Sequence, residues 1–88
     1  MVSQKVVVKN ESGIHARPAG VLAKEAMKCT SDVVILTGDK TVQAKSILNL
    51  MAAAIKAGTE ITVQCNGENE EEDLKKLVDL IESGLGEA

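Results

Sequence analysis

His15 is the only histidine of the chain, and it lies in the segment Gly-Ile-His-Ala-Arg-Pro-Ala at positions 13–19. An imidazole is largely neutral at pH 7, so a ring nitrogen offers a lone pair without help from a separate base. That nitrogen can attack a phosphorus atom and form a phosphoramidate. Two residues further on, the planar guanidinium of Arg17 suits phosphate oxygens. These residue types at this spacing predict an acceptor site for a phosphoryl group.

A helix is expected to position this site. Apolar residues recur at helical spacing after His15 and predict a helix over about 16–28. Pro18 falls in its first turn, where backbone N–H groups have no intrahelical acceptor anyway. The free N–H groups of Ala16 and Arg17 and the helix dipole favour an anion at this helix start. The dipole alone contributes only about 0.3–1 kcal/mol. The alternative that the spacing leaves open is a solvent-facing His15 that serves only as the helix N-cap.

The remaining segments alternate between strand and helix patterns. Strands are expected over 2–8, 32–37, 40–44 and 60–66, the first as a buried, valine-rich strand. A tight turn at Gly38-Asp39 joins the middle two as a hairpin. The order βαββαβα predicts a two-layer α+β domain, a single domain over 1–88, with amphipathic helices on one face of a half-exposed sheet.

Two further helices complete this order. The first opens at Ser46 and closes at Gly58 as C-cap, with one apolar stripe of Ile47, Leu50, Met51, Ala54 and Ile55. The last begins with a capping-box pattern, Asn69 followed by Glu72, and ends before Gly84. Its apolar stripe consists of Leu74, Leu77, Val78 and Ile81.

Composition excludes several classes of function. The 88 residues include no Phe, Tyr or Trp and carry a net charge of −3, which makes nucleic acid a poor ligand. Residues 1–67 carry +3 and residues 68–88 carry −6, so a mildly basic body can attract acidic partners. No stretch approaches the roughly 20 apolar residues of a membrane span, and we expect no membrane insertion and a cytoplasmic location.

The cysteines and the lone histidine argue against a metal site. Cys29 and Cys65 lack the CxxC spacing of zinc or redox sites and are interpreted as small buried thiols. A metal-carrying ferredoxin-like domain, of similar size, needs a CxxC loop where this chain has Ser-Gly-Ile-His-Ala-Arg-Pro. An enzyme with its own turnover needs a second general base and a substrate pocket, and neither is indicated near His15.

The segment at 13–19, the Lys45-Ser46-Ile47 segment, the chain length and the βαββαβα order resemble the HPr family, the histidine phosphocarriers of the bacterial phosphoenolpyruvate-dependent sugar phosphotransferase system. The resemblance covers nearly the whole chain. It implies an open-faced sandwich with a four-stranded antiparallel sheet of order 1-4-2-3 and three helices on one face. It implies that the carrier itself needs no metal or organic cofactor. Because no long apolar stripe remains to be covered, we expect a monomer.

The resemblance also assigns roles. His15 is implied to accept the phosphoryl group on Nδ1 from phosphorylated enzyme I and to pass it to enzyme IIA domains of sugar permeases. Arg17 is implied to stabilise the phosphate and the transfer state, and Pro18 to set how the chain enters the helix. The implied partner-binding patch consists of Gly20, Lys24, Ile47, Leu48 and Met51. For Ile47 and Met51 this conflicts with the buried stripe that their spacing predicts, and we give the resemblance more weight.

Ser46 matches the serine that an ATP-dependent HPr kinase/phosphorylase modifies in some bacteria. Phosphoserine adds about −1.5 to −2 charge, which would repel an acidic enzyme I surface. The modified form is implied to bind a transcription factor of carbon catabolite repression. The rival hypothesis is a regulatory module that uses only Ser46, as in relatives that lack the active histidine. The chain departs from the family pattern at Ser12, and at Asn49 and Ala54, where glycines are common.

Overall fold

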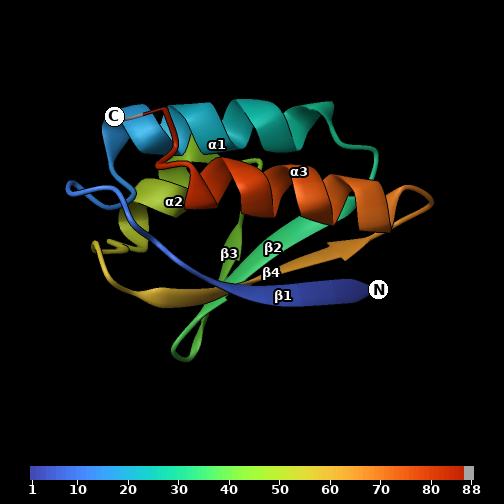
Figure 1. Ribbon diagram of the computed structural model, residues 1–88, viewed down its shortest axis with the longest axis horizontal. Coiled ribbons are helices and arrows are strands. Elements are labelled where there is room, and N and C mark those ends of the chain that lie inside the picture. The colour runs from blue at the N-terminus through green and yellow to red at the C-terminus, as the bar shows by residue number, and fades with distance from the viewer. Residues whose placement is uncertain (87–88) are drawn as a thin grey trace.

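The computed structural model describes residues 1–86 and contains four strands and three helices (Figure 1). Their order along the chain is β1 (Val2–Val7), α1 (Ala16–Lys28), β2 (Asp32–Thr37), β3 (Lys40–Gln43), α2 (Ile47–Ala52), β4 (Glu60–Asn66) and α3 (Glu70–Glu82). The predicted βαββαβα order is confirmed, and the bounds expected for α1, β2 and β4 agree with the structure.

The four strands form one antiparallel sheet of order β1-β4-β2-β3, as the resemblance implied. Along β4, Ile61, Val63 and Cys65 are buried, while the residues between them are half-buried. This alternation directs every second side chain toward the helices. The valine-rich β1 is an edge strand, and the expectation of a buried strand is wrong for it, because only Val6 of its residues is buried.

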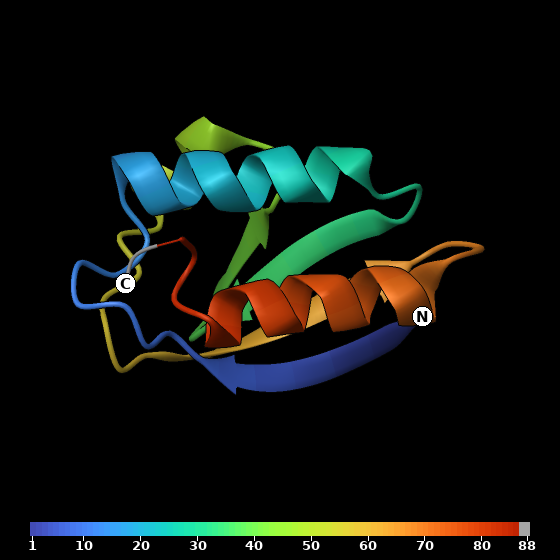
Figure 2. The same ribbon diagram turned by 45° about the horizontal axis from the view of Figure 1, so that its top comes forward.

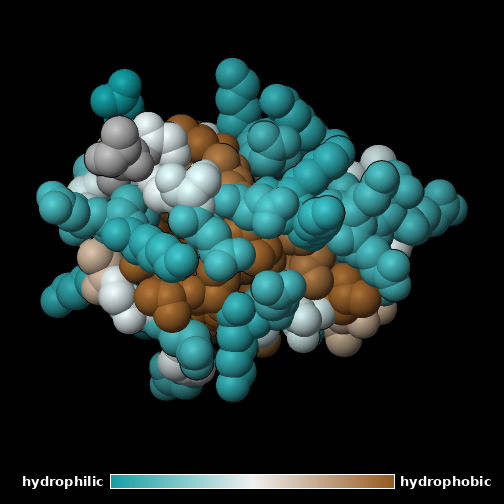
Figure 3. Space-filling model, in the orientation of Figure 1, coloured by the Kyte–Doolittle hydropathy of each residue, from teal (hydrophilic) through white to brown (hydrophobic). Residues whose placement is uncertain are grey.

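The three helices lie on one face of the sheet, with α1 and α3 side by side (Figures 1 and 2). Their buried apolar residues share one core with the sheet, and the predicted stripe of α3 is buried: Leu74, Leu77, Val78 and Ile81. The face seen in Figure 3 carries mostly hydrophilic side chains around a hydrophobic band at the level of α3 and β1. After α3 the chain turns toward α1, where Gly86 lies beside Val21.

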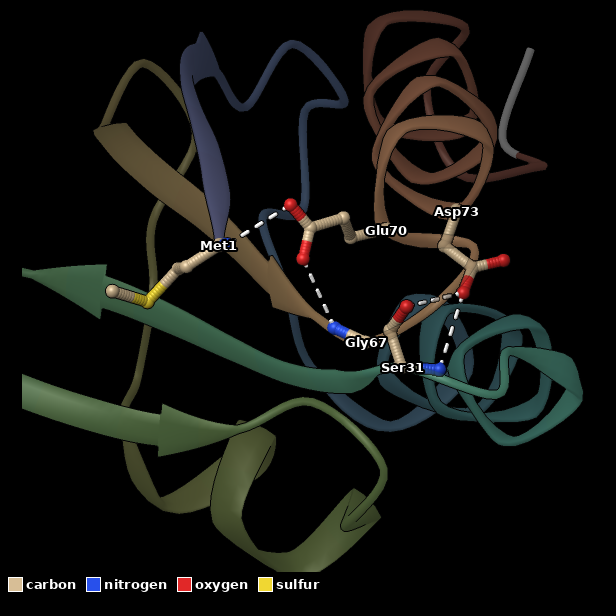
Figure 4. A network of polar contacts seen from close by, with 5 residues as sticks. All are labelled: Met1, Ser31, Gly67, Glu70 and Asp73. Carbon is tan, nitrogen blue, oxygen red and sulfur yellow. Dashed lines mark hydrogen bonds and ion pairs between the residues drawn. The ribbon is translucent and has the colours of Figure 1, made fainter.

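The predicted capping box of α3 is not formed. Asn69 is the N-cap residue, yet its side chain makes no capping bond. Its Nδ2 donates to Thr30 Oγ1 at 3.3 Å. Glu70 binds the preceding turn instead: its Oε1 accepts from Gly67 N–H at 3.1 Å and its Oε2 lies 2.9 Å from the Met1 amino group (Figure 4). These two contacts lower the pKa of Glu70, and the contact with the Met1 amino group has the larger effect.

The helix α2 is shorter than its sequence pattern predicts. It ends at Ala52, Ala53 is its C-cap, and Ala54 has a positive φ of 52°. Ile55 lies outside the helix and forms an isolated antiparallel bridge with Ile14. The apolar spacing through Ile55 therefore spans a helix and a bridged segment, whose residues Leu50 and Ile55 are buried in the same core. The assignment of Gly58 as the C-cap is wrong, because Ala53 is the C-cap.

Candidate functional site

His15 is the N-cap residue of α1 and its side chain is exposed. Its backbone is extended, with φ −123° and ψ −157°, and its carbonyl oxygen accepts from Ala19 N–H at 2.7 Å. Its imidazole makes no capping hydrogen bond. The alternative of a histidine that serves only as a cap therefore explains the position of the backbone but gives the ring no role. The ring is left available for chemistry at the protein surface.

Backbone contacts fix the loop that carries His15. Ile14 N–H donates to Ile55 O at 2.8 Å, and Gly13 N–H donates to Asn10 O at 3.0 Å. Gly13 has a φ of +67°, and a Cβ built on it would lie 2.5 Å from Ile55 O and 2.9 Å from Lys56 Cα. Only glycine fits so close an approach of two backbones. The loop before His15 is thus held against the segment that follows α2.

The first turn of α1 carries the other predicted site residues. Arg17 is exposed and Pro18 is buried. The N–H groups of Ala16 and Arg17 precede the first intrahelical donor, Ala19, and have no acceptor within the helix. Buried Pro18 fixes this turn without presenting a donor of its own. The turn therefore presents two N–H groups at the helix start where His15 lies, and it carries the exposed Arg17.

A hollow of about 520 Å³ lies beside His15. Two segments that are distant in sequence line it, and its residues are Glu11, Ser12, Ile14, His15, Met51, Ala54, Ile55, Lys56 and Ala57. Sequence analysis did not assign Lys56, Glu11 or Ser12 to the site. The Ile14–Ile55 bridge and the close approach of Gly13 to Lys56 bring Lys56 near His15, and no local pattern reveals that pairing. The site therefore has one wall from the loop of residues 11–15 and another from residues 51–57.

The surface of α2 is apolar. Leu48 is 78% exposed, Ile47 42% and Met51 43%, whereas Leu50 is buried in the core. The buried stripe predicted from spacing is therefore wrong for Ile47 and Met51, because a helix of six residues buries only one of its sides here. Their exposure agrees with the resemblance. Because Met51 also lines the hollow beside His15, the apolar surface adjoins the site.

The other two residues of the partner-binding patch that the resemblance implies belong to α1. Gly20 is half-buried, Lys24 is exposed, and α1 packs against α2. We define the α1/α2 patch as Gly20, Lys24, Ile47, Leu48 and Met51.

Ser46 is the N-cap of α2, as predicted. Its Oγ accepts from Asn49 N–H at 3.2 Å and from Asn49 Nδ2 at 3.0 Å. The hydroxyl is half-buried and close to the α1/α2 patch through its chain neighbour Ile47.

The cysteines are free and buried. Burial raises the pKa of the Cys29 thiol, and burial first and the neighbouring Cys29 second raise that of Cys65 to about 11. Thiols with raised pKa values are poor nucleophiles and poor metal ligands at pH 7. Within residues 1–86, no three His, Cys, Asp or Glu side chains are grouped so that they could hold a metal ion. In the same part of the chain, no helix has both the length and the apolar character needed to cross a membrane.

An exposed histidine at the start of a helix, with an exposed arginine in the first turn, forms a surface site that a partner protein can reach. Comparison with known families matches residues 2–83 to the family described as "PTS HPr component phosphorylation site". The chain belongs to the HPr family of phosphocarriers of the phosphotransferase system, which are relay proteins rather than enzymes.

Individual relatives cover most of the chain. The HPr-like protein Crh of Bacillus subtilis is 48% identical over 77 residues, which are 88% of this chain and 91% of Crh. The phosphocarrier protein HPr of Mycoplasma capricolum is 43% identical over 77 residues, 88% of this chain and 86% of that protein. The solved structure of HPr-C-His from Thermoanaerobacter tengcongensis superposes with a TM-score of 0.95 at 39% identity and covers 100% of this chain and 99% of that one.

Proposed function

We propose that this chain relays a phosphoryl group from phosphorylated enzyme I to enzyme IIA domains of sugar permeases, and that His15 carries the group. The single observation that supports this most directly is that the imidazole of His15 is exposed and makes no capping bond at the start of α1. A side chain in that state can meet a partner's phosphoryl group without first leaving a structural contact.

The proposed chemistry uses Nδ1 of His15. Its lone pair attacks the phosphorus held by enzyme I, a P–N bond forms, and the bond to the donor breaks. Nε2 keeps its proton, so no separate base is needed. The transferred group bears negative charge, which the Arg17 guanidinium and the N–H groups at the start of α1 offset. Transfer to enzyme IIA repeats the step in the opposite sense, with His15 as the leaving group.

The α1/α2 patch is the proposed docking surface for both partners. One of its exposed apolar residues, Met51, lines the same hollow as His15. Large aliphatic side chains that protrude into solvent form the apolar centre of a protein interface, and Lys24 and Arg17 add positive charge at its edge. A partner with an acidic rim fits this surface. We further propose that the protein works as a cytoplasmic monomer without cofactor.

The proposal extends to regulation at Ser46. One structural relative is described as Crh, the Bacillus subtilis catabolite repression HPr, and it is 45% identical to this chain. We propose that an HPr kinase/phosphorylase modifies Ser46, and that the product binds a catabolite-control transcription factor. A phosphate on Ser46 would place two negative charges beside Ile47 of the α1/α2 patch and oppose docking of an acidic partner.

A labelling experiment tests the relay. The protein is mixed with phosphoenolpyruvate and enzyme I, and intact mass and peptide mapping locate any added phosphoryl group. We expect one acid-labile, alkali-stable group on His15, its transfer to an added enzyme IIA, and no label on His15→Ala. Absence of label on the wild-type His15 contradicts the relay and leaves a regulatory module that uses Ser46 as the better hypothesis.

A further inference from the structure

The Ser46 hydroxyl oxygen accepts two hydrogen bonds from one residue. The first, from Asn49 N–H at 3.2 Å, is the usual N-cap bond that starts a helix. The second, from Asn49 Nδ2 at 3.0 Å, comes from the side chain and adds nothing that the helix start requires. Because a hydroxyl oxygen has two lone pairs, Asn49 occupies both of them.

Phosphorylation of Ser46 needs one of these lone pairs. The oxygen attacks the γ-phosphorus of ATP, a P–O bond forms, the bond to the leaving ADP breaks, and the hydroxyl proton passes to a base of the kinase. At least one hydrogen bond to the oxygen must therefore be released before attack. The bond from Asn49 N–H is part of the backbone of α2, whereas the bond from Nδ2 is released by rotation of an exposed side chain.

The Asn49 side chain has space to rotate. It lines a hollow of about 430 Å³ between β3 and α2, together with Lys40, Thr41, Val42, Leu48, Ala52 and Ala53. Because this space adjoins an exposed side chain, the amide can leave the hydroxyl without displacing a core residue, which would free one lone pair of the oxygen. A substitution that removes the amide shifts the equilibrium toward the arrangement with a free lone pair.

We propose that the Asn49 side chain is a positioning residue that restrains phosphorylation of Ser46 by engaging the second lone pair of its oxygen. This inference rests on the proposed regulation at Ser46 and names Asn49 as a residue that sets the rate of Ser46 phosphorylation. A neutral hydrogen bond of average net strength shifts the balance between engaged and free states about two- to tenfold. Asn49 therefore lowers the rate at Ser46 by that factor.

The test is Asn49→Ala, which removes Nδ2 and keeps the backbone N–H that caps α2. With ATP and a purified HPr kinase/phosphorylase, we expect kcat for Ser46 phosphorylation to rise about two- to tenfold and KM to stay constant. Asn49→Met, a good helix former without an amide, should show the same rise. Asn66→Ala, which removes an exposed amide at the end of β4, should show none. Amide exchange at Leu50 checks that α2 remains folded.

The outcomes separate this inference from the relay. An unchanged or lower rate in Asn49→Ala, a rise in only one of the two Asn49 variants, or an equal rise in Asn66→Ala overturns the role of Asn49. So does the absence of Ser46 phosphorylation in both wild type and the Asn49 variants. Labelling of His15 by enzyme I, measured on the same proteins, reports on the relay alone and is expected to be the same in all of them.

Discussion

Asp73 Oδ2 accepts two hydrogen bonds from Ser31, one from the backbone N–H at 3.2 Å and one from the hydroxyl at 2.6 Å (Figure 4). The two residues are 42 positions apart and both are buried. Their contact ties the first turn of α3 to the segment between α1 and β2. The hydroxyl bond of Ser31 lowers the pKa of Asp73, although burial acts in the opposite direction.

This pair predicts how stability depends on pH. Because the folded-state pKa of Asp73 lies below its unfolded value of about 3.9, its contribution is complete above that value and is lost as the pH falls through the folded-state pKa. We expect Asp73→Asn to lower the free energy of unfolding by about 1.5–3 kcal/mol at pH 7 and by less in acid. Urea unfolding from pH 7 to 3 measures the difference. Asp79→Asn, an exposed carboxylate on the same helix, is the control; parallel curves for wild type and Asp73→Asn contradict the prediction.

The backbone of Ala54 predicts a stabilising substitution. Its φ of 52° lies in the left-handed region, which costs a residue with a Cβ about 1–2 kcal/mol. We expect Ala54→Gly to raise the free energy of unfolding by about 1 kcal/mol, after allowance for the greater entropy of glycine in the unfolded chain. Ala53→Gly is the matched control, because the backbone of Ala53 is right-handed, with φ −69°. We expect this substitution to lower the free energy of unfolding by about 0.5–1 kcal/mol. Equal signs for the two substitutions in denaturant unfolding contradict this account.

Local patterns predicted much of this fold. The bounds of α1 and β4 follow from apolar spacing and alternation, because each element buries its own residues against one core. The end of α2 could not be predicted in this way. Ile55 continues the helical spacing, but its backbone pairs with Ile14, 41 positions earlier. Ala54, with its positive φ, turns the chain out of the helical path just before Ile55.

The candidate site shows the same division. The spacing of His15 and Arg17 within one helix turn is visible in the sequence, and both residues are exposed in the structure. The second wall of the site, from Met51 to Ala57, depends on long-range backbone pairing that no local period encodes. The exposure of Ile47 and Met51 came from the family resemblance, whereas their spacing predicted the opposite.

The close approach at Gly13 predicts a loss of both stability and activity. A Cβ at Gly13 meets Ile55 O at 2.5 Å and also forces an alanine to φ +67°. We expect Gly13→Ala to lower the free energy of unfolding by more than about 2 kcal/mol and to slow phosphorylation of His15 by enzyme I. Gly38→Ala separates the two causes, since Gly38 has a φ of +59° but no atom within 4 Å of the added Cβ. A loss at Gly13 no greater than that at Gly38 contradicts the role of the backbone contact.

A substitution at Arg17 tests whether the shape of the guanidinium, as well as its charge, matters for phosphate binding. Arg17→Lys keeps the positive charge but loses the planar fork that binds two phosphate oxygens at once. We expect the rate of phosphoryl transfer through His15 to fall about tenfold, equivalent to ~1.4 kcal/mol, with the free energy of unfolding within about 0.5 kcal/mol of wild type. Rapid-quench measurement of His15 labelling gives the rate. Lys5→Gln, an exposed lysine on β1, is the control for a general effect of surface cations; an unchanged rate in Arg17→Lys shows that charge alone suffices.

Leu48 tests the α1/α2 patch, because its side chain is 78% exposed and its removal leaves the core intact. We expect Leu48→Ser to change the free energy of unfolding by less than about 0.5 kcal/mol. We expect it to raise KM for the reaction with enzyme I about tenfold and to leave kcat nearly constant, since a docking contact contributes equally to bound substrate and transition state. Val7→Thr is the matched control: Val7 is exposed on β1, and a hydroxyl there should leave KM unchanged. If both variants behave like wild type with enzyme I and with enzyme IIA, the docking surface lies elsewhere, and the exposed apolar side of α2 needs another partner.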